Sequence, residues 1–570
     1  MNIQNNSEKF WLSIANNLYW TKKPKIALRV HKNKYLWFDD GLIDIYYNLI
    51  GRHLNSKKKD YKIIYIFDEC SEIKSYSYSE INDQVDNFLT NIDNIKKIRK
   101  ILIHSRASIE SVVTMLGCIK LGIEFSVVFE ELKNVAISKR INLFKPDLIL
   151  SNNYKINSEH NKNKKIKILR FDKALKRNSK KKPFLSKSFK SSKKIFTLFT
   201  SGSTGMPKGI VHSLGGYMVY AFYTSKKVFG MSDKSFILTA SDAGWINGHT
   251  YALFGPLLCK SKTLIMERPL MLLNKNSITN IINLGITILY LPVTIIRMLR
   301  SLNIGKINSK YLKNLGSMGE PLSNEVGNWF SNNFSLQNKH IINTYYQTEN
   351  GGVISSFCHN SKFKKNIHDS VGNSISKYIK FNSLLKKKKE IKILNPWPGI
   401  MTNVLGGRKL YNNYFDTNNN YLMFDFGSKK NNNIFIHGRS DDVINIRGHR
   451  IGSEELESTV LKNKNIIECS AVSLEDEFEG SVFVLFICIK TNYKINFNSI
   501  DKLIENNFGS FAIPRSTYVV NELPKTRSGK IMRRILRLLI NKRYEELKKE
   551  DTSTILNPST IKEIKEVLSK

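Results

Sequence analysis

Strand-like and helix-like segments alternate along an early part of the chain. Apolar runs at 61–67, 98–105 and 124–129 are strand candidates. The segments between them, 79–92 and 109–122, carry apolar residues at the spacing of a helix. Because strands that alternate with helices form sheets covered by helices, the pattern predicts an α/β layered fold.

The amino-acid composition and the predicted elements change further along the chain. Residues 10–55 are rich in aromatic side chains and predict a helical and loop lead-in, whereas 155–194 are poor in apolar residues and predict a loop. Alternation resumes at 195, and after Arg439 a smaller unit begins, with its own strands and a basic C-terminal helix. No period of about 20–50 residues is present, which argues against a solenoid. The predicted domains are a lead-in (1–60), a large domain (61–440) and a C-terminal domain (441–570).

The bulk composition is that of a large globular protein. A chain of 570 residues with 41% hydrophobic side chains can bury several cores. No run approaches ~18 apolar residues, and the N-terminal stretch lacks the basic and apolar regions of a signal peptide, so no transmembrane helix or secretory signal is expected. The six cysteines are scattered without metal-ligand spacing, which predicts reduced, mostly buried thiols in a cytoplasmic protein.

The formal net charge of +41 would by itself favour nucleic acid or an anionic membrane as the partner. The lysines are spread along the whole chain among asparagines, however, and the denser runs at 176–194 and 386–389 lie in polar stretches without interleaved aromatics. Such runs are typical of solvated loops. We therefore expect neither a nucleic-acid nor a membrane partner, although the charge should attract anionic substrates.

The segment TSGSTGMPKG, residues 200–209, is the strongest candidate for a chemical site. An apolar run enters it, its glycines let several backbone amides point into one concavity, and Lys208 adds a positive charge. Clustered donors of this kind suit a polyphosphate. The lysine is followed by Gly209 and Ile210, so this is not the GxxxxGK[ST] nucleotide loop. A flexible Gly/Ser linker is the competing interpretation of the run taken alone.

Further motifs follow in order along the chain, and together with TSGSTGMPKG they resemble the adenylate-forming superfamily of acyl-CoA synthetases, luciferases and peptide-synthetase adenylation domains. Within it the chain looks most like acetyl-CoA and propionyl-CoA synthetases, and the resemblance covers nearly the whole chain. A single motif would be weak support, but a set in fixed order makes chance a poor explanation. The motifs are SDAGWINGHTY (241–251), GSMGEP (316–321), YYQTENGG (345–352), NPWPG (395–399), GRSDDVINIRGHRIGSEELE (438–457) and LPKTRSGKIMRRIL (523–536).

The resemblance implies both a fold and a reaction. The fold would be a large layered N-terminal adenylation domain, built from two α/β subdomains and a small β-rich subdomain, with a small mobile α+β C-terminal domain. The reaction would use ATP, Mg²⁺ and coenzyme A. A carboxylate attacks the α-phosphorus of ATP and releases pyrophosphate, and the coenzyme A thiol then takes the acyl group and releases AMP.

The resemblance also assigns catalytic roles. Lys530 would reach the α-phosphate and the carboxylate in the first step, Thr348 would donate to the α-phosphate, and Glu349 would hold Mg²⁺. Arg450 would contact the phosphates, and Asp441 would be the hinge between the domains. For the arginine and the lysine, an ordinary solvated charge is the competing interpretation.

Nucleotide contacts are implied along several motifs. Asp425 and Arg439 would bind the ribose, and Asn343 would face the amino edge of adenine, where the family commonly has aspartate. Met423 and Phe424 replace the Thr-Gly that usually precedes the ribose aspartate. The complete predicted ATP/AMP set is Thr200, Ser201, Gly202, Ser203, Thr204, Gly205, Lys208, Gly319, Glu320, Pro321, Asn343, Thr344, Tyr345, Tyr346, Gln347, Thr348, Asp425, Arg439 and Arg450.

The acyl pocket would take a short acid of two to roughly four carbons, with room for a polar substituent. Relatives close the floor of the acyl pocket with a tryptophan where this chain has the smaller Tyr346. Met318 replaces a smaller aliphatic residue and so fills part of the space that the tyrosine leaves. A pocket simply repacked around acetate is the competing interpretation. The predicted lining is Trp245, Ile246, Asn247, Met318 and Tyr346.

The thiol acceptor is the other open choice. Gly448 and the family-like segment around it favour coenzyme A. Glu130 and Glu131 stand where relatives have a glycine pair, and Glu505 replaces an arginine that touches coenzyme A phosphates, so a carrier-protein thiol or an amine is the alternative acceptor. A basic nucleic-acid or membrane-binding protein and a non-catalytic relative are the remaining alternatives, and the ordered motifs argue against both.

Overall fold

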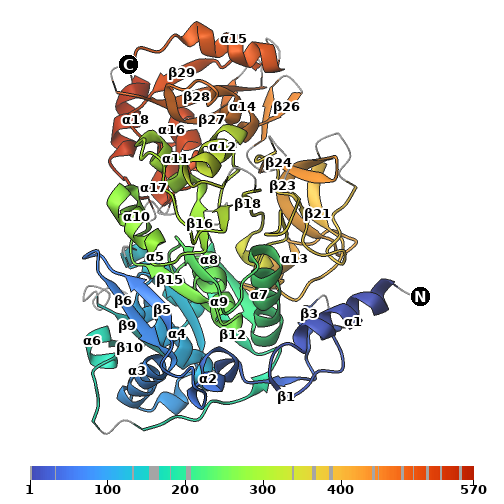
Figure 1. Ribbon diagram of the computed structural model, residues 1–570. Helices are drawn as coiled ribbons and strands as arrows, with labels where there is room; N and C mark the ends of the chain where they lie inside the picture. Colours follow the sequence, from blue (N-terminus) through green and yellow to red (C-terminus); the bar gives the residue numbers. More distant parts are fainter. Residues whose placement is uncertain are drawn as a thin grey trace.

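The computed structural model describes a large body with a smaller C-terminal unit stacked on it (Figure 1). The two chain ends lie far apart, since α1 (Ile3–Ala15) runs along the edge of the body and α18 (Thr560–Ser569) lies in the small unit. The described residues are 3–31, 34–130, 132, 134–152, 166–179, 182–200, 207–336, 339–362, 367–383, 389–439, 443–446, 449–476, 480–491, 493–508, 512–526, 529–550 and 555–569.

A first seven-stranded sheet has the order β10-β9-β7-β8-β12-β13-β22. The strands up to β12 are parallel, and β13 and β22 run antiparallel to their neighbours. The strands are nearly continuous apolar runs, as expected of a sheet buried on both faces. They are β7 (Lys100–His104), β8 (Glu124–Val128), β9 (Leu148–Ser151), β10 (Lys167–Leu169), β12 (Lys194–Thr200), β13 (Lys208–Ser213) and β22 (Asn403–Leu405).

A second seven-stranded sheet has the order β18-β17-β16-β14-β15-β5-β6 and is parallel except for β6. The last two strands in this order, β5 and β6, come from the beginning of the chain, whereas the others come from residues 236–343. The strands are β5 (Lys62–Phe67), β6 (Ile73–Ser77), β14 (Phe236–Thr239), β15 (Lys262–Met266), β16 (Ile288–Pro292), β17 (Asn314–Met318) and β18 (Ile342–Asn343).

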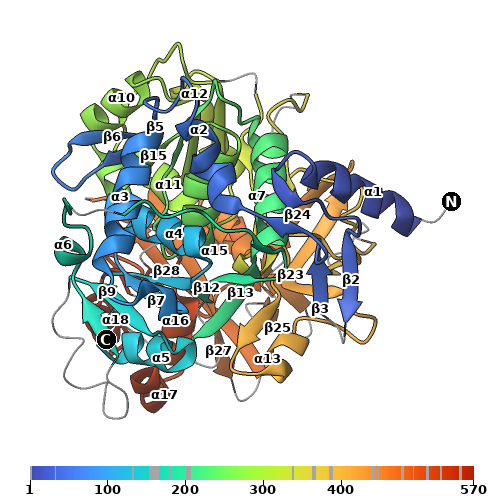
Figure 2. The same ribbon diagram turned by 90° about the horizontal axis from the view of Figure 1, so that it is seen from below.

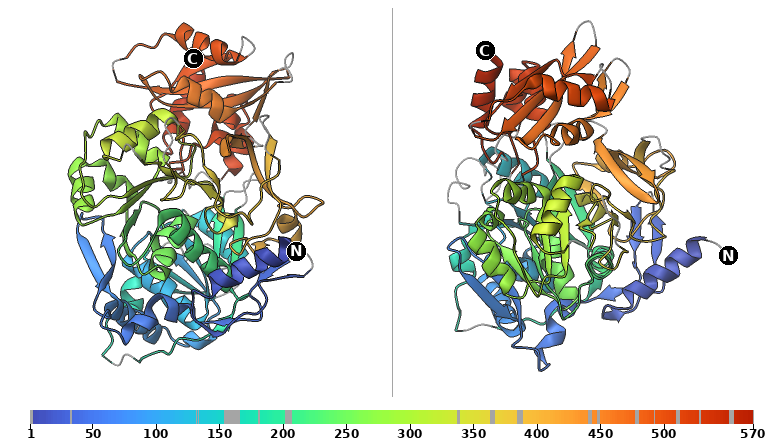
Figure 3. Two further views of the ribbon diagram at one scale, coloured as in Figure 1. Left: turned by 45° about the vertical axis from the view of Figure 1, so that its right-hand side comes forward. Right: turned by 45° about the horizontal axis from the view of Figure 1, so that its top comes forward.

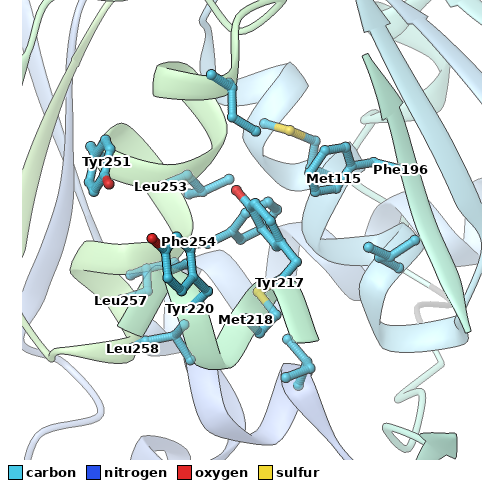
Figure 4. Packing of buried hydrophobic residues seen from close by; sticks show 14 of the residues in the cluster. Met115, Phe196, Tyr217, Met218, Tyr220, Tyr251, Leu253, Phe254, Leu257 and Leu258 are labelled. Atoms are coloured by element: carbon cyan, nitrogen blue, oxygen red, sulfur yellow. The ribbon is translucent and has the colours of Figure 1, made fainter. Parts of the chain in front are cut away.

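Helices fill the space between the sheets. Helix α7 (Leu214–Phe229) packs on β13 of the first sheet and on α9 (Gly255–Leu258), which packs on β15 of the second. Figure 2 shows α4 (Ile109–Leu121) and α7 between the two sets of strands. Figure 4 shows the resulting apolar core, with side chains from both helices and from the π-helical turn η4 (Thr250–Phe254).

Other helices cover the outer faces and connect the strands. Within the described residues no helix is long and apolar enough to span a membrane. The remaining helical segments of the body are η1 (Tyr47–Gly51), α2 (Arg52–Leu54), α3 (Tyr78–Asn91), η2 (Ile95–Lys97), α5 (Asn134–Phe144), α6 (Phe171–Ala174), α8 (Ile246–His249), η5 (Pro269–Leu273), α10 (Lys275–Asn283), α11 (Val293–Ser301), α12 (Asn324–Asn333), η6 (Thr348–Asn350) and α13 (Arg408–Asn412).

Small antiparallel sheets complete the body. One of them, β21-β23-β24, forms a subdomain at the side of the two large sheets (Figure 3). The strands are β1 (Trp20–Lys22), β2 (Leu28–His31), β3 (Lys34–Trp37), β4 (Leu42–Ile43), β11 (Phe189–Lys190), β19 (Ser355–Ser356), β20 (Asn373–Ser374), β21 (Lys389–Ile393), β23 (Tyr421–Lys430) and β24 (Asn433–Arg439).

The C-terminal unit has its own two apolar clusters, on either face of the sheet β27-β28-β29. An ion pair between Arg533 and Glu457, 2.5 Å apart, joins two of its helices. Its elements are β25 (Val443–Ile446), β26 (His449–Gly452), α14 (Ser453–Val460), β27 (Ile466–Asp476), β28 (Gly480–Ile489), α15 (Phe497–Phe508), β29 (Ser516–Val519), α16 (Arg533–Ile540), α17 (Tyr544–Lys549) and α18.

The layered α/β class predicted from the sequence is confirmed, and two local expectations are corrected. The lead-in contains the short strands β1 to β4 besides its helices, and the predicted loop at 155–194 contains β10, α6 and β11 in its described part. Strand β11 pairs with β4 through Phe189 and Ile43. Such a pairing joins segments far apart in the chain, so local composition could not reveal it.

Candidate active site

The two strands that flank the predicted phosphate turn in the sequence, β12 and β13, form an antiparallel pair. Thr200 is the register partner of Lys208 at the point where the turn begins and ends. Residues 201–206, which include the predicted Ser201 to Gly205, lie outside the described residues. The Nζ atom of Lys208 lies 5.4 Å from the centre of the Tyr414 ring, a cation–π contact that fixes where the cation stands.

Tyr414 also holds the carboxylate predicted to bind Mg²⁺. Its hydroxyl donates to Oε1 of Glu349 over 2.8 Å, and the carboxylate is buried. Among the described residues no three His, Cys, Asp or Glu side chains gather into a metal site. A single buried carboxylate beside a lysine fits a hard cation that takes its other ligands from phosphate oxygens and water. Bound there, Mg²⁺ would neutralise phosphate charge.

His212 supports the turn that carries Thr348 and Glu349. Its Nε2 atom lies 2.9 Å from the carbonyl oxygen of Thr348, across from β13 to η6. Burial lowers the pKa of His212 to about 4, so the ring is neutral at physiological pH and donates its N–H to the carbonyl. Sequence motifs did not single out His212, although it lies four residues after Lys208 on the same strand.

The predicted ribose carboxylate is held by two residues of the YYQTE motif. Tyr345 donates its hydroxyl to Oδ2 of Asp425 over 2.6 Å, and Nε2 of Gln347 lies 3.1 Å from the same oxygen. Arg439 is the register partner of Asp425 on the neighbouring strand β24. The structure therefore brings three of the predicted ribose and nucleotide residues together with Arg439 beside them.

Phe424, which stands where the family usually has glycine, has a backbone conformation that favours glycine. Its φ is +53°, in the left-handed region that bulky residues rarely adopt. Such a conformation costs of order 1–3 kcal/mol and persists only when the surroundings hold it. The Phe424 and Tyr414 rings form a T-shaped pair with centres 5.7 Å apart, so the replacement side chain packs on the residue that supports Glu349.

The Asn343 side chain is buried and forms hydrogen bonds within the protein. Its Oδ1 accepts from the Ser317 hydroxyl over 3.0 Å, and its Nδ2 lies 3.0 Å from the carbonyl of His368. The side chain is 1% exposed, so the amide ties β17 and β18 to the following loop. A contact between Asn343 and the adenine amino edge stays a prediction.

A directed hydrogen-bond chain runs from Tyr346 into the second sheet. Thr344 donates to the Ser317 carbonyl over 2.8 Å, so the Tyr290 hydroxyl, 2.6 Å away, must donate to Thr344. The Tyr346 hydroxyl, 3.3 Å from that of Tyr290, is then the donor of the last link. Burial raises the pKa of Tyr346 well above its usual value, which keeps this hydroxyl neutral.

The other predicted acyl-pocket residues lie at the ends of α8 and β17. Nδ2 of Asn247 lies 2.6 Å from the sulfur of Met318, so these two side chains meet. Trp245 precedes α8 and packs on Phe129, with ring centres 5.4 Å apart. Ile246 is buried beside them. The predicted acyl-pocket residues thus include aromatic and sulfur-containing side chains, a tyrosine hydroxyl and a primary amide, and their role as a pocket stays a prediction.

The segment predicted to line adenine follows Met318. Gly319 has φ of +87°, and a side chain built on it would meet no atom within 4 Å. The Glu320 carboxylate turns to α11, where its Oε2 lies 2.6 Å from Nη1 of Arg297, and Pro321 accepts from the same guanidinium. The backbone of this segment, rather than the Glu320 carboxylate, is left for a base.

The C-terminal unit brings its lysine turn to the same region. Lys530 is exposed, and the carbonyl of Gly529 before it lies 3.3 Å from the hydroxyl of Thr294 on α11. Arg450 lies on β26 opposite Asn445, and nothing is described of its side chain. Asp441 and Gly448 lie outside the described residues, so the hinge and the thiol-side position stay predictions.

Comparison with known proteins agrees with this arrangement. Residues 53–397, which hold the hairpin, the predicted acyl-pocket residues and the YYQTE turn, match the family "AMP-binding enzyme". The chain belongs to the AMP-binding enzyme family. Residues 455–530 match the C-terminal domain of AMP-binding enzymes, and residues 2–49 match the acetyl-coenzyme A synthetase N-terminus.

Individual relatives of this AMP-binding enzyme extend over nearly its whole length. Acetyl-coenzyme A synthetase of Helicobacter acinonychis (strain Sheeba) is 31% identical, with 98% of this chain and 93% of the relative covered. Acetyl-coenzyme A synthetase of Penicillium chrysogenum is 29% identical over 93% of this chain and 86% of its own.

Solved structures share the fold at low identity. Acetoacetyl-CoA synthetase from Streptomyces lividans superposes with a TM-score of 0.80 at 14% identity, covering 99% of this chain and 93% of its own. The anthranilate CoA ligase AuaEII, in complex with anthranoyl-AMP, superposes with a TM-score of 0.77 at 15% identity, covering 88% of this chain and 98% of its own. The two-domain α/β architecture of this AMP-binding enzyme is therefore that of CoA ligases.

Proposed function

We propose that this AMP-binding enzyme is an AMP-forming acyl-CoA synthetase, an acid–thiol ligase that activates a short carboxylate. A carboxylate oxygen attacks the α-phosphorus of ATP, the bond to the bridging oxygen breaks, and pyrophosphate leaves. The coenzyme A thiol then loses its proton and attacks the acyl carbon, and AMP leaves with the electrons of the broken C–O bond. The charge that gathers on phosphorus in the first step needs positioned cations and donors.

One observation carries the proposal: side chains of the YYQTE turn contact both Asp425 and Tyr414, the partner of Lys208. Tyr345 and Gln347 hold Asp425, the predicted ribose carboxylate, and Glu349 shares Tyr414 with Lys208. Tyr346, the predicted acyl-pocket residue, lies between them in the chain and contacts Tyr290. A single rigid turn would thus set the carboxylate of the acid against the phosphates. Such fixed geometry is the main source of rate in a phosphoryl-type displacement.

We assign Lys530 to the first half-reaction. Lys530→Ala should lower acid-dependent exchange of labelled pyrophosphate into ATP by about 10²–10³-fold, because a cation at the developing charge is lost. Thioester formation from chemically prepared acyl-adenylate should remain. Lys542→Ala, a change of an exposed lysine after α16, is the matched control. Wild-type protein that exchanges no pyrophosphate with any small acid would overturn the proposed function.

We propose an acid of two to about four carbons, and the polar groups among the predicted pocket residues favour a substituent that donates a hydrogen bond. Because the Tyr346 hydroxyl donates to Tyr290, its oxygen lone pairs are the part that can serve a ligand. A panel of acetate, propionate, butyrate and their 2- and 3-hydroxy and keto forms tests this. Preference for long fatty acids would contradict it.

A carrier-protein thiol is the second candidate acceptor, favoured by the charges around Glu130. Arg106 holds Glu130 and Glu69, with 2.6 Å in both pairs, and Glu267 lies 3.7 Å away. Arg268 adds a second cation, 3.2 Å from Glu69. Three carboxylates against two guanidinium groups leave a net negative cluster at the ends of β5, β7, β8 and β15, which would repel coenzyme A phosphates.

Competition between acceptors decides between the two. AMP release would be measured with coenzyme A, with pantetheine, and with a phosphopantetheine-loaded carrier protein. Turnover with coenzyme A at the lowest concentration supports the acyl-CoA synthetase. Turnover that requires the carrier protein supports the alternative.

A further inference from the structure

The turn that carries Lys530 makes a close contact with the large domain at the beginning of α11. The Thr294 hydroxyl lies 3.3 Å from the Gly529 carbonyl and also 3.3 Å from Oε1 of Glu320. A hydroxyl has one proton, so it donates to one of these acceptors at a time. Figures 1 and 3 show the C-terminal unit stacked over α11 and α12.

Glycine is required where the turn meets α11. Gly529 has φ of +83°, and a Cβ atom there would lie 2.5 Å from Cγ2 and 2.6 Å from Cβ of Thr294. Both the backbone conformation and the space exclude a side chain. The fit of Gly529 against Thr294 is therefore specific to this docked arrangement.

The turn reaches α11 as a preformed unit. Thr526 donates its amide to the Lys530 carbonyl over 2.8 Å, and Gly529 donates its amide to Thr526 over 2.8 Å. Lys525 forms an ion pair of 2.6 Å with Glu468 on β27, and both side chains are at least 90% buried. Position and orientation of the turn thus follow the sheet of the C-terminal unit.

Arg297 holds Glu320, the other hydrogen-bond acceptor of the Thr294 hydroxyl, in place. Its Nη1 lies 2.6 Å from Oε2 of Glu320, one turn of α11 beyond Thr294. When the Gly529 carbonyl withdraws, the Thr294 hydroxyl turns to Glu320 and keeps a partner. Release of the turn therefore leaves no buried hydroxyl unpaired, which keeps its cost low.

We infer that Thr294 is the docking residue for the Lys530 turn. Its hydroxyl donates to the turn and so holds the C-terminal unit in the arrangement that forms the acyl-adenylate. When the unit leaves, the hydroxyl donates instead to Glu320 of the Glu320–Arg297 pair. Thr294 and Arg297 are positioning residues, since they act through the turn rather than on the reacting atoms. The inference rests on the proposed function, in which the C-terminal unit serves two half-reactions from different positions.

Three variants separate docking from folding. Thr294→Val removes the hydroxyl at nearly constant shape and should slow acid-dependent pyrophosphate exchange about 5- to 20-fold. Thr294→Ser keeps the hydroxyl and should stay within about twofold of wild type. Gly529→Ala blocks the close approach and should slow exchange more than 100-fold. Thioester formation from prepared acyl-adenylate should change less than about twofold in all three. Equal loss in both half-reactions, or failure of Thr294→Ser to retain activity, would overturn the assignment.

Hydrogen exchange does not depend on catalysis, so it tests the docking contact separately from the proposed function. Hydrogen exchange of the peptides that contain Gly529 and α11 should be faster in Thr294→Val than in wild type, with no substrate present. Faster exchange in a protein that activates no acid would uphold the docking contact and overturn only the proposed function. Unchanged exchange in Thr294→Val would overturn the docking contact.

Discussion

At the scale of single residues, Tyr414 joins groups that the motifs present separately. It places its ring under Lys208 of the hairpin and its hydroxyl on Glu349 of the YYQTE turn. No motif includes it, because it lies in the loop between α13 and β23 and reaches the site only through the folding of the small subdomain. Only the structure could identify it.

Tyr414→Phe should raise the KM for Mg·ATP about 3- to 10-fold and lower kcat less, because the Glu349 carboxylate loses a donor worth ~1 kcal/mol while the ring stays under Lys208. Tyr414→Leu removes both contacts and should lower kcat further. Steady-state kinetics with varied Mg·ATP measures the difference. A KM for Mg·ATP that Tyr414→Phe leaves unchanged would show that the hydroxyl is not what positions Glu349.

The sequence motifs could predict which residues are candidates for the site, but not which partners their side chains contact. Asp425 contacts Tyr345 and Gln347 of the turn that also carries Thr348 and Glu349, while the roles of these residues stay predictions. The commitment of Asn343 to backbone carbonyls and of Glu320 to Arg297 could not be predicted, because both depend on which neighbouring loops happen to reach them.

At the scale of elements, strands and helices with strong apolar periodicity were predicted close to their bounds. The helix predicted at 109–122 is α4, Ile109–Leu121, which begins at the cap Ser108 and ends at Gly122 with φ of +69°. Local signals of this kind survive folding. The packing partner of α4 could not be predicted, and it includes a buried ion pair between Lys120 and Asp86 of α3, 2.7 Å apart and at most 4% exposed.

Lys120→Met should destabilise the protein by about 3–5 kcal/mol, because Asp86 is left charged and buried without its cation. Lys120 also lies 4.6 Å from the Tyr46 ring, so the lead-in would loosen from α4 as well. The double variant Lys120→Met with Asp86→Leu removes both charges and should recover most of the loss. Urea unfolding would measure both, and a single variant as stable as wild type would contradict the prediction.

At the scale of the whole molecule, buried neutral histidines tie stability to pH. Burial lowers the pKa of His212 to about 4 and that of His249, enclosed by Phe196 and Phe254, to about 3. A histidine in the unfolded chain has a pKa of ~6.5, so the unfolded state binds protons that the folded state does not bind. Other buried histidines with a pKa lowered to about 4 are His53, His104 and His368.

These histidines contribute fully above pH ~6.5, and their contribution is lost as pH falls from there toward about 4. We expect the urea midpoint to fall steeply over that window. His249→Phe should flatten the slope by one proton, ~1.4 kcal/mol per pH unit. His249→Leu gives the same test with a smaller side chain. A slope that neither replacement changes would contradict this account.

The place of β5 in the second sheet has a consequence for how the protein is made. Its neighbour β15 is far downstream, so the ribosome must add roughly 200 residues, at about 5–20 residues per second, after β5 emerges. For those seconds the nascent β5–β6 hairpin offers a bare apolar edge to other chains. The two large sheets therefore cannot be produced as separate halves, and a truncated translation product that stops before β15 should aggregate.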